Sequence, residues 1–290
     1  MTDLGGPVLV TGATGMIGAA VRTELEHRGA RVHASAVDLL DGAATRTLMA
    51  EVRPAALVHC AWGSSTGAAV QSAEQARWCD AGAELLSAFG RSGGRAALVA
   101  GSSAEYDWSA PLLDEQRTRV APATAYGRAK HELHQRGRDI AEAFGFTLAW
   151  PRIFFVYGPR EHAERLVPSV ARALLSGRAA PCTDGRQQRD YQYVDDVAGQ
   201  LVSLLQARCD HPVNVGSGRP IAVRELVEAV AAEIGRPELI EFGALPRRPH
   251  EPDRLIADVT RLHRLIGDAE RISLAEGVRR TVAWWRAQNP

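Results

Sequence analysis

A tyrosine and a lysine stand four positions apart in the stretch TAYGRAK, residues 124–130. On a helix this spacing places Tyr126 and Lys130 on one face, where the ammonium can sit near the phenol and favour its ionised form. A phenol whose pKa moves down from about 10 can pass or receive a proton at a substrate oxygen. The same spacing is common on solvated helix faces, so catalysis needs support from the rest of the chain.

Three glycines near the start of the chain could hold a cofactor. In VLVTGATGMIG, Gly12, Gly15 and Gly18 stand between an apolar run and an amphipathic helical pattern. Glycines there permit a tight turn and a close approach of the backbone to a pyrophosphate, and the helix start offers free N–H groups to the anion. With a strand before it and a helix after it, the motif predicts dinucleotide binding instead of a merely structural turn.

Short apolar runs alternate with longer helical patterns up to residue 153. Runs such as PVLV, AALVHCA and RAALVAGS are almost wholly apolar, as is typical of strands buried on both faces of a parallel sheet. Helical patterns cover 68–92 and 125–144, and the second carries Tyr126 and Lys130. This order predicts an α/β fold with a doubly wound parallel (Rossmann) sheet.

After Pro159 the elements become shorter and turns more frequent, without a Gly/Ser-rich linker. This texture predicts a smaller C-terminal lobe interleaved with the sheet domain. We expect residues 1–160 to form the cofactor-binding domain with 186–215 returning to it, and 161–185 with 216–290 to form the substrate-binding lobe. Ligands of such sheets bind at the carboxyl ends of the strands, where the lobe would close over them.

The composition excludes several classes of partner. Thirty-four basic and thirty-four acidic residues cancel and are spread along the chain, which argues against nucleic acid. No apolar run approaches the roughly 18 residues that span a bilayer, and no signal peptide precedes the first strand, so we expect a soluble cytoplasmic protein with no membrane partner. The cysteines show neither a CxxC pair nor metal-ligand spacing and predict free thiols and no metal site. They are Cys60, Cys79, Cys182 and Cys209.

The residues after the second expected strand bear on which dinucleotide binds. Asp38 lies about 20 residues beyond Gly18, where NAD enzymes carry an acid for the ribose hydroxyls. Yet RVHASAVDLLD is compressed, as if the second and third strands were nearly continuous, which would send Asp38 toward the adenine and leave Ala36 at the ribose position. With Ser35 and His33 available as donors, a 2′-phosphate would be tolerated, and the sequence favours NADP over NAD.

Six motifs in this order resemble the extended short-chain dehydrogenase/reductase family, specifically its nucleotide-sugar epimerases, dehydratases and reductases. They are TGATGMIG, GSSAEY, YGRAK, PRIFFVYGPR, RDYQYVDDVA and VNVGSG. The resemblance covers essentially the whole chain and implies a nicotinamide cofactor and a nucleotide-diphosphate sugar. The cofactor contacts that it implies are Gly12, Thr14, Gly15, Met16, Ile17, Ser35, Asp38, Leu39, Ala61, Trp62, Tyr126, Lys130 and Arg152.

The resemblance also implies roles at the reacting carbon. Tyr126 would transfer the proton, Lys130 would also hold the nicotinamide ribose, and Ser103 would hydrogen-bond the substrate oxygen, with Ser102 ranked second for that role. Two serines at a strand end can instead be ordinary turn hydroxyls. Glu105 lies where an acid would face the sugar, but a lone acid there could equally be solvated.

The stretch GSSAEY bears on the reaction. Dehydratases of the family carry consecutive acids after the serine or threonine, and here the first of these positions is Ala104. The extra cysteine of the epimerase-reductases is also absent, and the motif resembles the 4-keto-6-deoxysugar reductases. We therefore expect NAD(P)H-dependent reduction of a keto group on a nucleotide-activated deoxysugar. The alternatives are a nucleotide-sugar 4-epimerase with tightly bound NAD and a non-catalytic dinucleotide sensor.

In the lobe, the resemblance implies that Arg189 and Arg248 meet the diphosphate of the sugar nucleotide, which suits guanidinium groups. The chain departs from the family pattern where an asparagine is usual and at a position beside the cofactor that is usually small. The departures are Phe155, Cys79 and Trp62, and the Trp62 ring could pack over the nicotinamide side. The expected substrate contacts are Ser102, Glu105, Phe155, Pro168, Cys182, Arg189 and Arg248.

The expected helices 68–92 and 125–144 bear on assembly. They carry apolar residues at helical spacing, and in the family the equivalent helices pair across a two-fold axis into a four-helix bundle. We expect a homodimer, and packing within one subunit is the alternative use of the same stripe. The residues of the stripe include Val70, Ala73, Leu133 and Ile140.

Overall fold

A parallel sheet forms the centre of the larger domain in this computed structural model, which describes residues 4–63, 67–248, 251–268 and 272–288. The strand order is β12-β7-β4-β3-β1-β2, with the short β5 beside β7. All of these pairings are parallel, and the order reverses at β1, as expected of a doubly wound sheet. The strands are β1 (Val8–Thr11), β2 (Val32–Ser35), β3 (Ala56–His59), β4 (Ala96–Val99), β5 (Gly101–Ser102), β7 (Thr147–Ile153) and β12 (Pro212–Val215).

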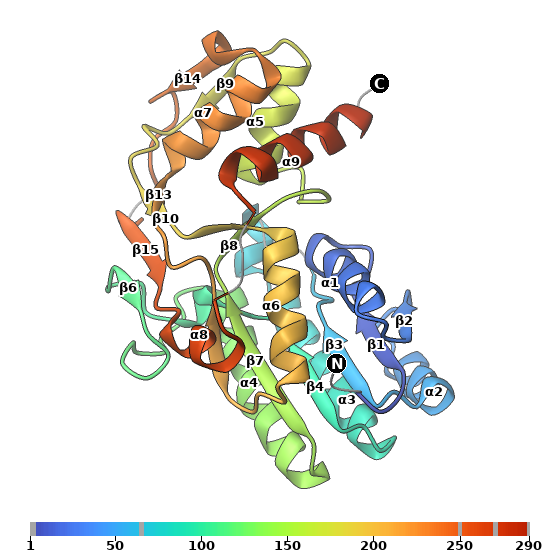
Figure 1. Cartoon of the computed structure of the whole chain (residues 1–290). Coiled ribbons are helices and arrows are strands. Elements are labelled where there is room, and N and C mark those ends of the chain that lie inside the picture. Colours follow the sequence, from blue (N-terminus) through green and yellow to red (C-terminus); the bar gives the residue numbers. More distant parts are fainter. Residues whose placement is uncertain (1–3, 64–66, 249–250, 269–271, 289–290) are drawn as a thin grey trace.

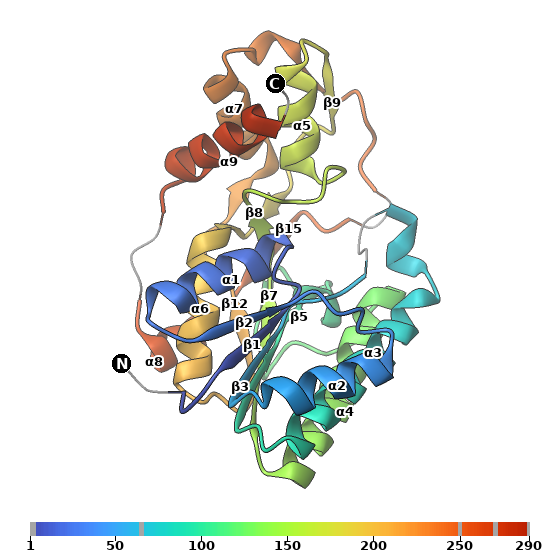
Figure 2. The ribbon, with the colours of Figure 1, turned by 90° about the vertical axis from the view of Figure 1, so that its right-hand side faces the viewer.

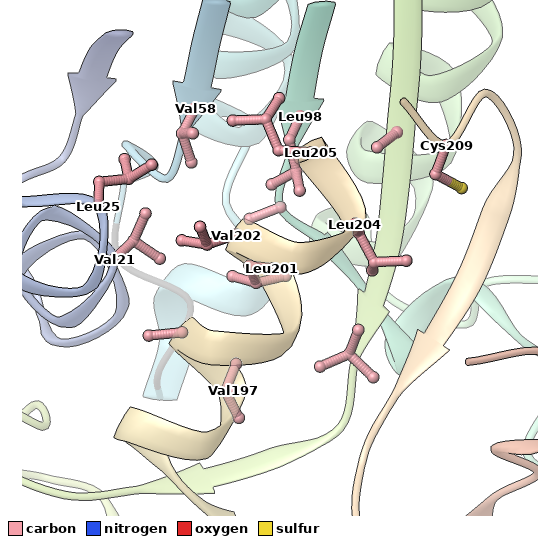
Figure 3. Packing of buried hydrophobic residues seen from close by; sticks show 14 of the residues in the cluster. Val21, Leu25, Val58, Leu98, Val197, Leu201, Val202, Leu204, Leu205 and Cys209 are labelled. Atoms are coloured by element: carbon pink, nitrogen blue, oxygen red, sulfur yellow. The ribbon is translucent and has the colours of Figure 1, made fainter. Parts of the chain in front are cut away.

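Helices cover both faces of the sheet (Figure 2). One face carries α1 (Met16–His27), α6 (Val194–Gln206) and α8 (Thr260–Ile266), and the other carries α2 (Gly42–Val52), α3 (Glu74–Arg91) and α4 (Ala125–Phe144). Figure 3 shows Val21 and Leu25 of α1 facing Val202 of α6, with Val58 and Leu98 of the sheet in the same buried cluster. Burial of both faces explains why β1, β3 and β4 are apolar throughout their centres.

A smaller lobe lies beyond the carboxyl ends of the strands (Figure 1). It has its own apolar core, to which its three helices and a parallel strand pair contribute. The core elements are α5 (Leu166–Leu175), α7 (Val223–Ile234), α9 (Leu274–Gln288), β9 (Ala180–Cys182) and β14 (Ile240–Phe242). The predicted interleaved lobe is therefore present.

Two small sheets join the domain to the lobe. Strands β13 (Ile221–Ala222), β10 (Gln188–Arg189), β15 (Arg254–Ala257) and β6 (Leu112–Leu113) form one, and β8 (Phe155–Tyr157) with β11 (Tyr191–Tyr193) forms the other. Between β10 and β11 the fully buried Asp190 accepts hydrogen bonds from the Ser217 amide and hydroxyl at 2.6 Å, from the Gly218 amide at 2.9 Å and from the Ala257 amide at 3.1 Å. One carboxylate thus holds three segments of the junction together.

The boundaries differ from the expected ones in two places. Helix α6 and strand β12 return to the large sheet as expected, but β10 pairs within the small sheet instead. Helix α8 falls in the range expected for the lobe, yet its buried Leu262 packs in the core beneath α6. The expected helix 68–92 is divided into a 3-10 turn at Gly67–Gln71 and α3.

The segment after β2 also differs from the expectation of nearly continuous strands. Helix α2 separates β2 from β3, and the Asp41 side chain caps it by accepting hydrogen bonds from the Ala43 and Ala44 amides. In the part of the chain that the structure describes, β2 is the edge strand on this side of the sheet. The expectation that the second and third strands are nearly continuous is therefore wrong, because a full helix lies between them.

Two 3-10 turns complete the described elements, Ser103–Glu105 after β5 and Pro237–Leu239 after α7. Within the described residues, none of the helices combines the length and apolar character needed to cross a membrane.

Candidate functional site

The glycine turn between β1 and α1 fits a pyrophosphate. Gly12 has φ of 69°, and a Cβ there would lie 2.6 Å from the Ala61 amide nitrogen, while a Cβ on Gly18 would lie 2.1 Å from the Gly12 oxygen. A Cβ on Gly15 would meet the Gly12 oxygen at 3.4 Å. No side chain caps α1 at Gly15, so its first N–H groups can bind an anion. The predicted contacts of this turn are Thr14, Met16 and Ile17, the last two being the first residues of α1.

The end of β2 carries no carboxylate. Ser35 is its last residue, with a hydroxyl that accepts a hydrogen bond from the Val37 amide, and Ala36 follows directly. Asp38 is exposed and accepts a hydrogen bond from the Leu40 amide at 3.0 Å. The predicted contact Leu39 is buried in the core.

Lys130 lies almost wholly inside the protein, with 3% of its surface exposed. Its Nζ donates to the Ala100 carbonyl at 2.8 Å and lies 3.6 Å from the centroid of a Trp62 ring. Burial lowers the pKa of Lys130 to about 7, against the opposing effect of Glu105. Lys130 is the single lysine among the 34 basic residues of the chain. This rarity could have singled out Lys130 in the sequence, in addition to its spacing from Tyr126.

Tyr126 lies in the first turn of α4, four positions before Lys130 and on the same helix face. The Thr124 hydroxyl fixes the start of this helix by accepting a hydrogen bond from the Gly127 amide. Burial raises the pKa of Tyr126, and a hydrogen bond with Ser102 and the charge of Arg165 lower it in part. The Lys130 Nζ is 5.9 Å from the Tyr126 ring centroid. The expectation that the ammonium brings this pKa down is therefore wrong for the free protein, because that ammonium is directed to Ala100 and Trp62.

Ser102, and not Ser103, is the serine beside Tyr126. Ser102 ends β5, lies in hydrogen-bonding reach of the Tyr126 hydroxyl and accepts a hydrogen bond from the Ala104 amide. Ser103 is buried as the chain turns into the 3-10 helix, and its carbonyl accepts from the Trp108 indole at 2.8 Å. Successive side chains point apart at a strand end, so only one of two adjacent serines meets the tyrosine.

Glu105 does not face a sugar. Its carboxylate is fully buried and accepts hydrogen bonds from the Ser102 amide at 2.8 Å, the Trp150 indole at 3.0 Å and the Arg152 Nε at 3.0 Å. Arg152, expected at the cofactor, is 3% exposed and lies 4.5 Å from the Tyr106 ring centroid. Both residues thus form an internal ion pair that fixes the segment carrying Ser102.

The same carboxylate belongs to a cluster with two histidines of α4. Among the described residues, Glu105, His131 and His134 bring potential metal-ligand atoms within 4.8 Å of one another. The guanidinium of Arg152 already pairs with Glu105, and the His134 ring stacks on Trp150 with centroids 4.8 Å apart. A dication would have to share the carboxylate with a guanidinium, so these residues fit a metal site poorly.

The lobe residues occupy different environments. Arg189 is 3% exposed, pairs with Glu251 at 2.7 Å and lies over the Phe155 ring, with 5.7 Å to the centroid. Arg248 is exposed, and its carbonyl accepts a hydrogen bond at 3.1 Å from the amide of Glu251, the residue that pairs with Arg189. A diphosphate at Arg189 would replace Glu251.

The expected base-pocket residues Pro168 and Cys182 are buried in the lobe core, on α5 and β9. An open pocket of about 730 Å³ lies at the small sheet that joins the domain to the lobe, with residues of β10 and β15 in its lining. Its lining residues are Asp184, Arg186, Gln188, Arg247, Asp253 and Arg254. Ion pairs of Arg247 with Asp184 and Asp253 cross it, so we do not assign the chemistry there.

Two charged residues escaped the sequence argument. Arg165 lies directly before α5, and its positive charge acts to lower the pKa of Tyr126, Tyr191 and Glu161. Glu161 is buried, and burial raises its pKa to about 8. Arg165 lies three residues before Pro168, an expected substrate contact, and this proximity was the signal that could have indicated it. No local pattern distinguishes Glu161 from a surface acid.

The overall structure is similar to that of UDP-glucose 4-epimerase from Thermus thermophilus in complex with NAD. The TM-score is 0.86 at 25% identity, and the alignment covers 97% of this chain and 99% of that chain. A second structure, MoeE5 in complex with UDP-glucose and NAD, gives a TM-score of 0.85 at 25% identity and covers 98% of this chain and 100% of that one. The likeness therefore includes both the sheet domain and the lobe.

Curated relatives match shorter segments. The dTDP-glucose 4,6-dehydratase of Streptomyces griseus is 35% identical over 135 residues, which is 44% of this chain and 40% of that protein. The UDP-glucuronate 4-epimerase of Thermodesulfobacterium geofontis is 25% identical over 205 residues, 69% of this chain and 61% of that protein. The matches thus span less than two thirds of the length of either relative.

The ion pair of Glu105 with Arg152 can be tested by a double-mutant cycle. Glu105→Gln should lower the free energy of unfolding by about 3–5 kcal/mol, because Arg152 then stays buried without a counter-charge. Arg152→Met in the Glu105→Gln background should recover much of that loss, as followed by chemical denaturation. The exposed pair Arg138–Asp139 is the matched control, with a coupling of about 0–1 kcal/mol. Strictly additive losses at Glu105 and Arg152 would contradict the assignment.

The family model for the NAD dependent epimerase/dehydratase family matches residues 8–216. This range includes the glycine turn, the serine pair at the end of β5, and both Tyr126 and Lys130. It covers most of the chain and ends just after β12, the last strand of the large sheet. The chain therefore belongs to the NAD dependent epimerase/dehydratase family.

Proposed function

We propose that this protein reduces a keto group on a nucleotide-activated deoxysugar, with NADPH as the hydride donor and Tyr126 as the proton donor. The observation that carries the proposal is the meeting of Tyr126, Ser102 and the single lysine at the carboxyl ends of the strands, beside a glycine turn that fits a dinucleotide. A non-catalytic dinucleotide sensor has no need of a poised proton donor.

The protonation state of Tyr126 supports the direction of the reaction. Because burial raises its pKa, the phenol is protonated at neutral pH and can donate to a developing alkoxide. The Ser102 hydroxyl would hold the same substrate oxygen, and the nicotinamide would supply the hydride. Lys130 would hold the nicotinamide ribose and, in its charged form, stabilise the phenolate left behind.

Elimination of water has less support. Ala104 cannot act as an acid or base, and Glu105 is buried in its ion pair with Arg152. A 4-epimerase remains the second candidate, supported by the likeness to a UDP-glucose 4-epimerase holding NAD. An epimerase that begins by oxidising an alcohol needs Tyr126 as a base, and its raised pKa opposes that role in the free protein.

The cofactor preference rests on the end of β2. Ala36 stands directly after the strand, so no carboxylate would repel a 2′-phosphate there, and we propose NADP over the NAD held by both structural relatives. For the substrate we propose a diphosphate at Arg189, in exchange for Glu251, with Arg248 as a second contact from the exposed edge. The cytoplasmic location stays a prediction.

Consumption of NADPH against a panel of nucleotide 4-keto sugars tests the function. We expect net oxidation of NADPH with at least one member, and a loss of about 10²–10⁴-fold in kcat for Tyr126→Phe. The dissociation constant for NADPH should stay within about twofold, because the ring still packs. Tightly held NAD without net consumption would favour the epimerase, and absence of any turnover would favour the sensor.

The two adjacent serines give a matched pair of variants in the same assay. Ser102→Ala should lower kcat by about 10²-fold, the effect of losing one hydrogen bond to a developing oxyanion. Ser103→Ala should leave kcat within about threefold of the parent, because the Ser103 hydroxyl does not meet Tyr126. A threefold change corresponds to about 0.6 kcal/mol of activation free energy. The opposite ranking would return the role to Ser103.

We also propose a homodimer through α3 and α4. Val70, Ala73 and Ile140 keep part of their surface exposed, whereas Leu133 is fully buried against α3 and belongs to the core of the subunit. Light scattering should give about twice the 31.2 kDa of one chain. A monomer mass across the working concentration range would contradict the dimer.

A further inference from the structure

Lys130 presents a problem of charge. Its amino group is buried, it is the single lysine of the chain, and burial of an ammonium favours loss of its proton. The proposed function requires that the group can carry a charge. Something inside the protein must therefore oppose the effect of burial.

We infer that the indole face of Trp62 acts as the internal counter-charge of Lys130, so that Trp62 is a positioning residue for the catalytic ammonium. The Lys130 Nζ lies 3.6 Å from the Trp62 ring centroid, well inside the roughly 6 Å range of a cation–π contact. Tryptophan offers the strongest such face, and the contact is worth more in a desolvated site. This inference rests on the proposed role of Lys130.

The Trp62 ring is held in place. Its Nε1 donates to the Gln75 side chain at 2.7 Å, and Gln75 in turn donates to the Ala69 carbonyl at 2.8 Å. Tyr126 meets the ring edge-on with centroids 6.2 Å apart, and Trp78 lies at 6.3 Å on a tilted plane. The indole face is thus directed at Lys130 by Gln75 and Trp78 on α3 and by Tyr126 on α4, with Gln75 held in turn by the 3-10 turn before α3.

The Ala100 carbonyl accepts a hydrogen bond from the Lys130 amine at 2.8 Å, and the remaining groups around Lys130 supply little compensating charge. Glu105 raises the pKa of Lys130, but its carboxylate is shared with Arg152. The other titratable neighbours are Cys60 after β3, Cys79 on α3, His59 on β3 and Tyr126 on α4. Burial keeps these thiols and the phenol protonated, and it lowers the pKa of His59 to about 3, so all four are neutral near pH 7.

The contact has a defined consequence for the ammonium. With the pKa of Lys130 at about 7, a small change in its surroundings decides whether the group is charged at neutral pH. Removal of the indole face should lower this pKa further, because the ammonium then loses a contact that stabilises it against burial. Binding of the nicotinamide ribose and support of the phenolate would then require a lower pH.

The single lysine makes this pKa directly measurable. Protein labelled with ¹³C and ¹⁵N lysine should give one side-chain NMR signal, whose titration in the free protein reports Lys130 alone. Trp62→Leu should lower the titration midpoint by about one pH unit, the shift that corresponds to a buried cation–π contact. Trp62→Phe, which keeps a weaker aromatic face, should give a smaller decrease.

Trp78→Leu is the matched control. It removes a second indole beside Trp62, and the described structure shows no contact of that ring with the Lys130 amine. Circular dichroism should show that each variant is folded, and Trp62→Phe alone carries the test if Trp62→Leu does not fold. An unchanged midpoint in the Trp62 variants, or an equal shift in Trp78→Leu, would overturn the inference. Because no substrate or cofactor is added, this result is independent of whether the proposed reaction occurs.

Discussion

The site depends on one buried negative charge, the carboxylate of Glu105. Burial of an unpaired carboxylate is strongly unfavourable, so the fold must supply donors to it. These come from the Ser102 amide, the Trp150 indole and the Arg152 guanidinium, which belong to two neighbouring strands. The end of β5 is fixed in this way, and with it the position of Ser102 beside Tyr126. The same charge also raises the pKa of both Lys130 and Tyr126.

The electrostatics of the free site differ from the usual view of a tyrosine activated by a nearby lysine. Burial acts on both groups, raising the pKa of Tyr126 and lowering that of Lys130. The two therefore approach the neutral phenol and neutral amine instead of the ion pair. A protonated phenol is the form that can donate a proton during reduction of a carbonyl group. The indole face of Trp62 then matters because, together with the Ala100 carbonyl, it favours the ammonium without adding a second full charge.

The lobe is joined to the sheet by a comparable device. Asp190 gathers backbone and hydroxyl donors from the turn after β12 and from β15, so the small sheet and the large sheet share one buried acceptor. Its neighbour Arg189 is satisfied by Glu251 in the free protein. A diphosphate that replaces Glu251 would be exchanged against an existing ion pair, which reduces the net gain from binding.

Local patterns in the sequence were enough to predict the parallel sheet, the interleaved lobe, the glycine turn and the shared helix face of Tyr126 and Lys130. Each depends on local periodicity or on a backbone conformation that particular residues allow. Three features became visible only in the folded chain: Ser102 and not Ser103 meets the tyrosine, Glu105 and Arg152 pair inside the protein, and Lys130 is directed to Trp62. These outcomes depend on how the ends of separate strands and helices approach one another and on how deeply each charge is buried. Burial and contact between distant segments leave no periodic signal in a single sequence, because the energy of a buried charge is set by all the groups around it.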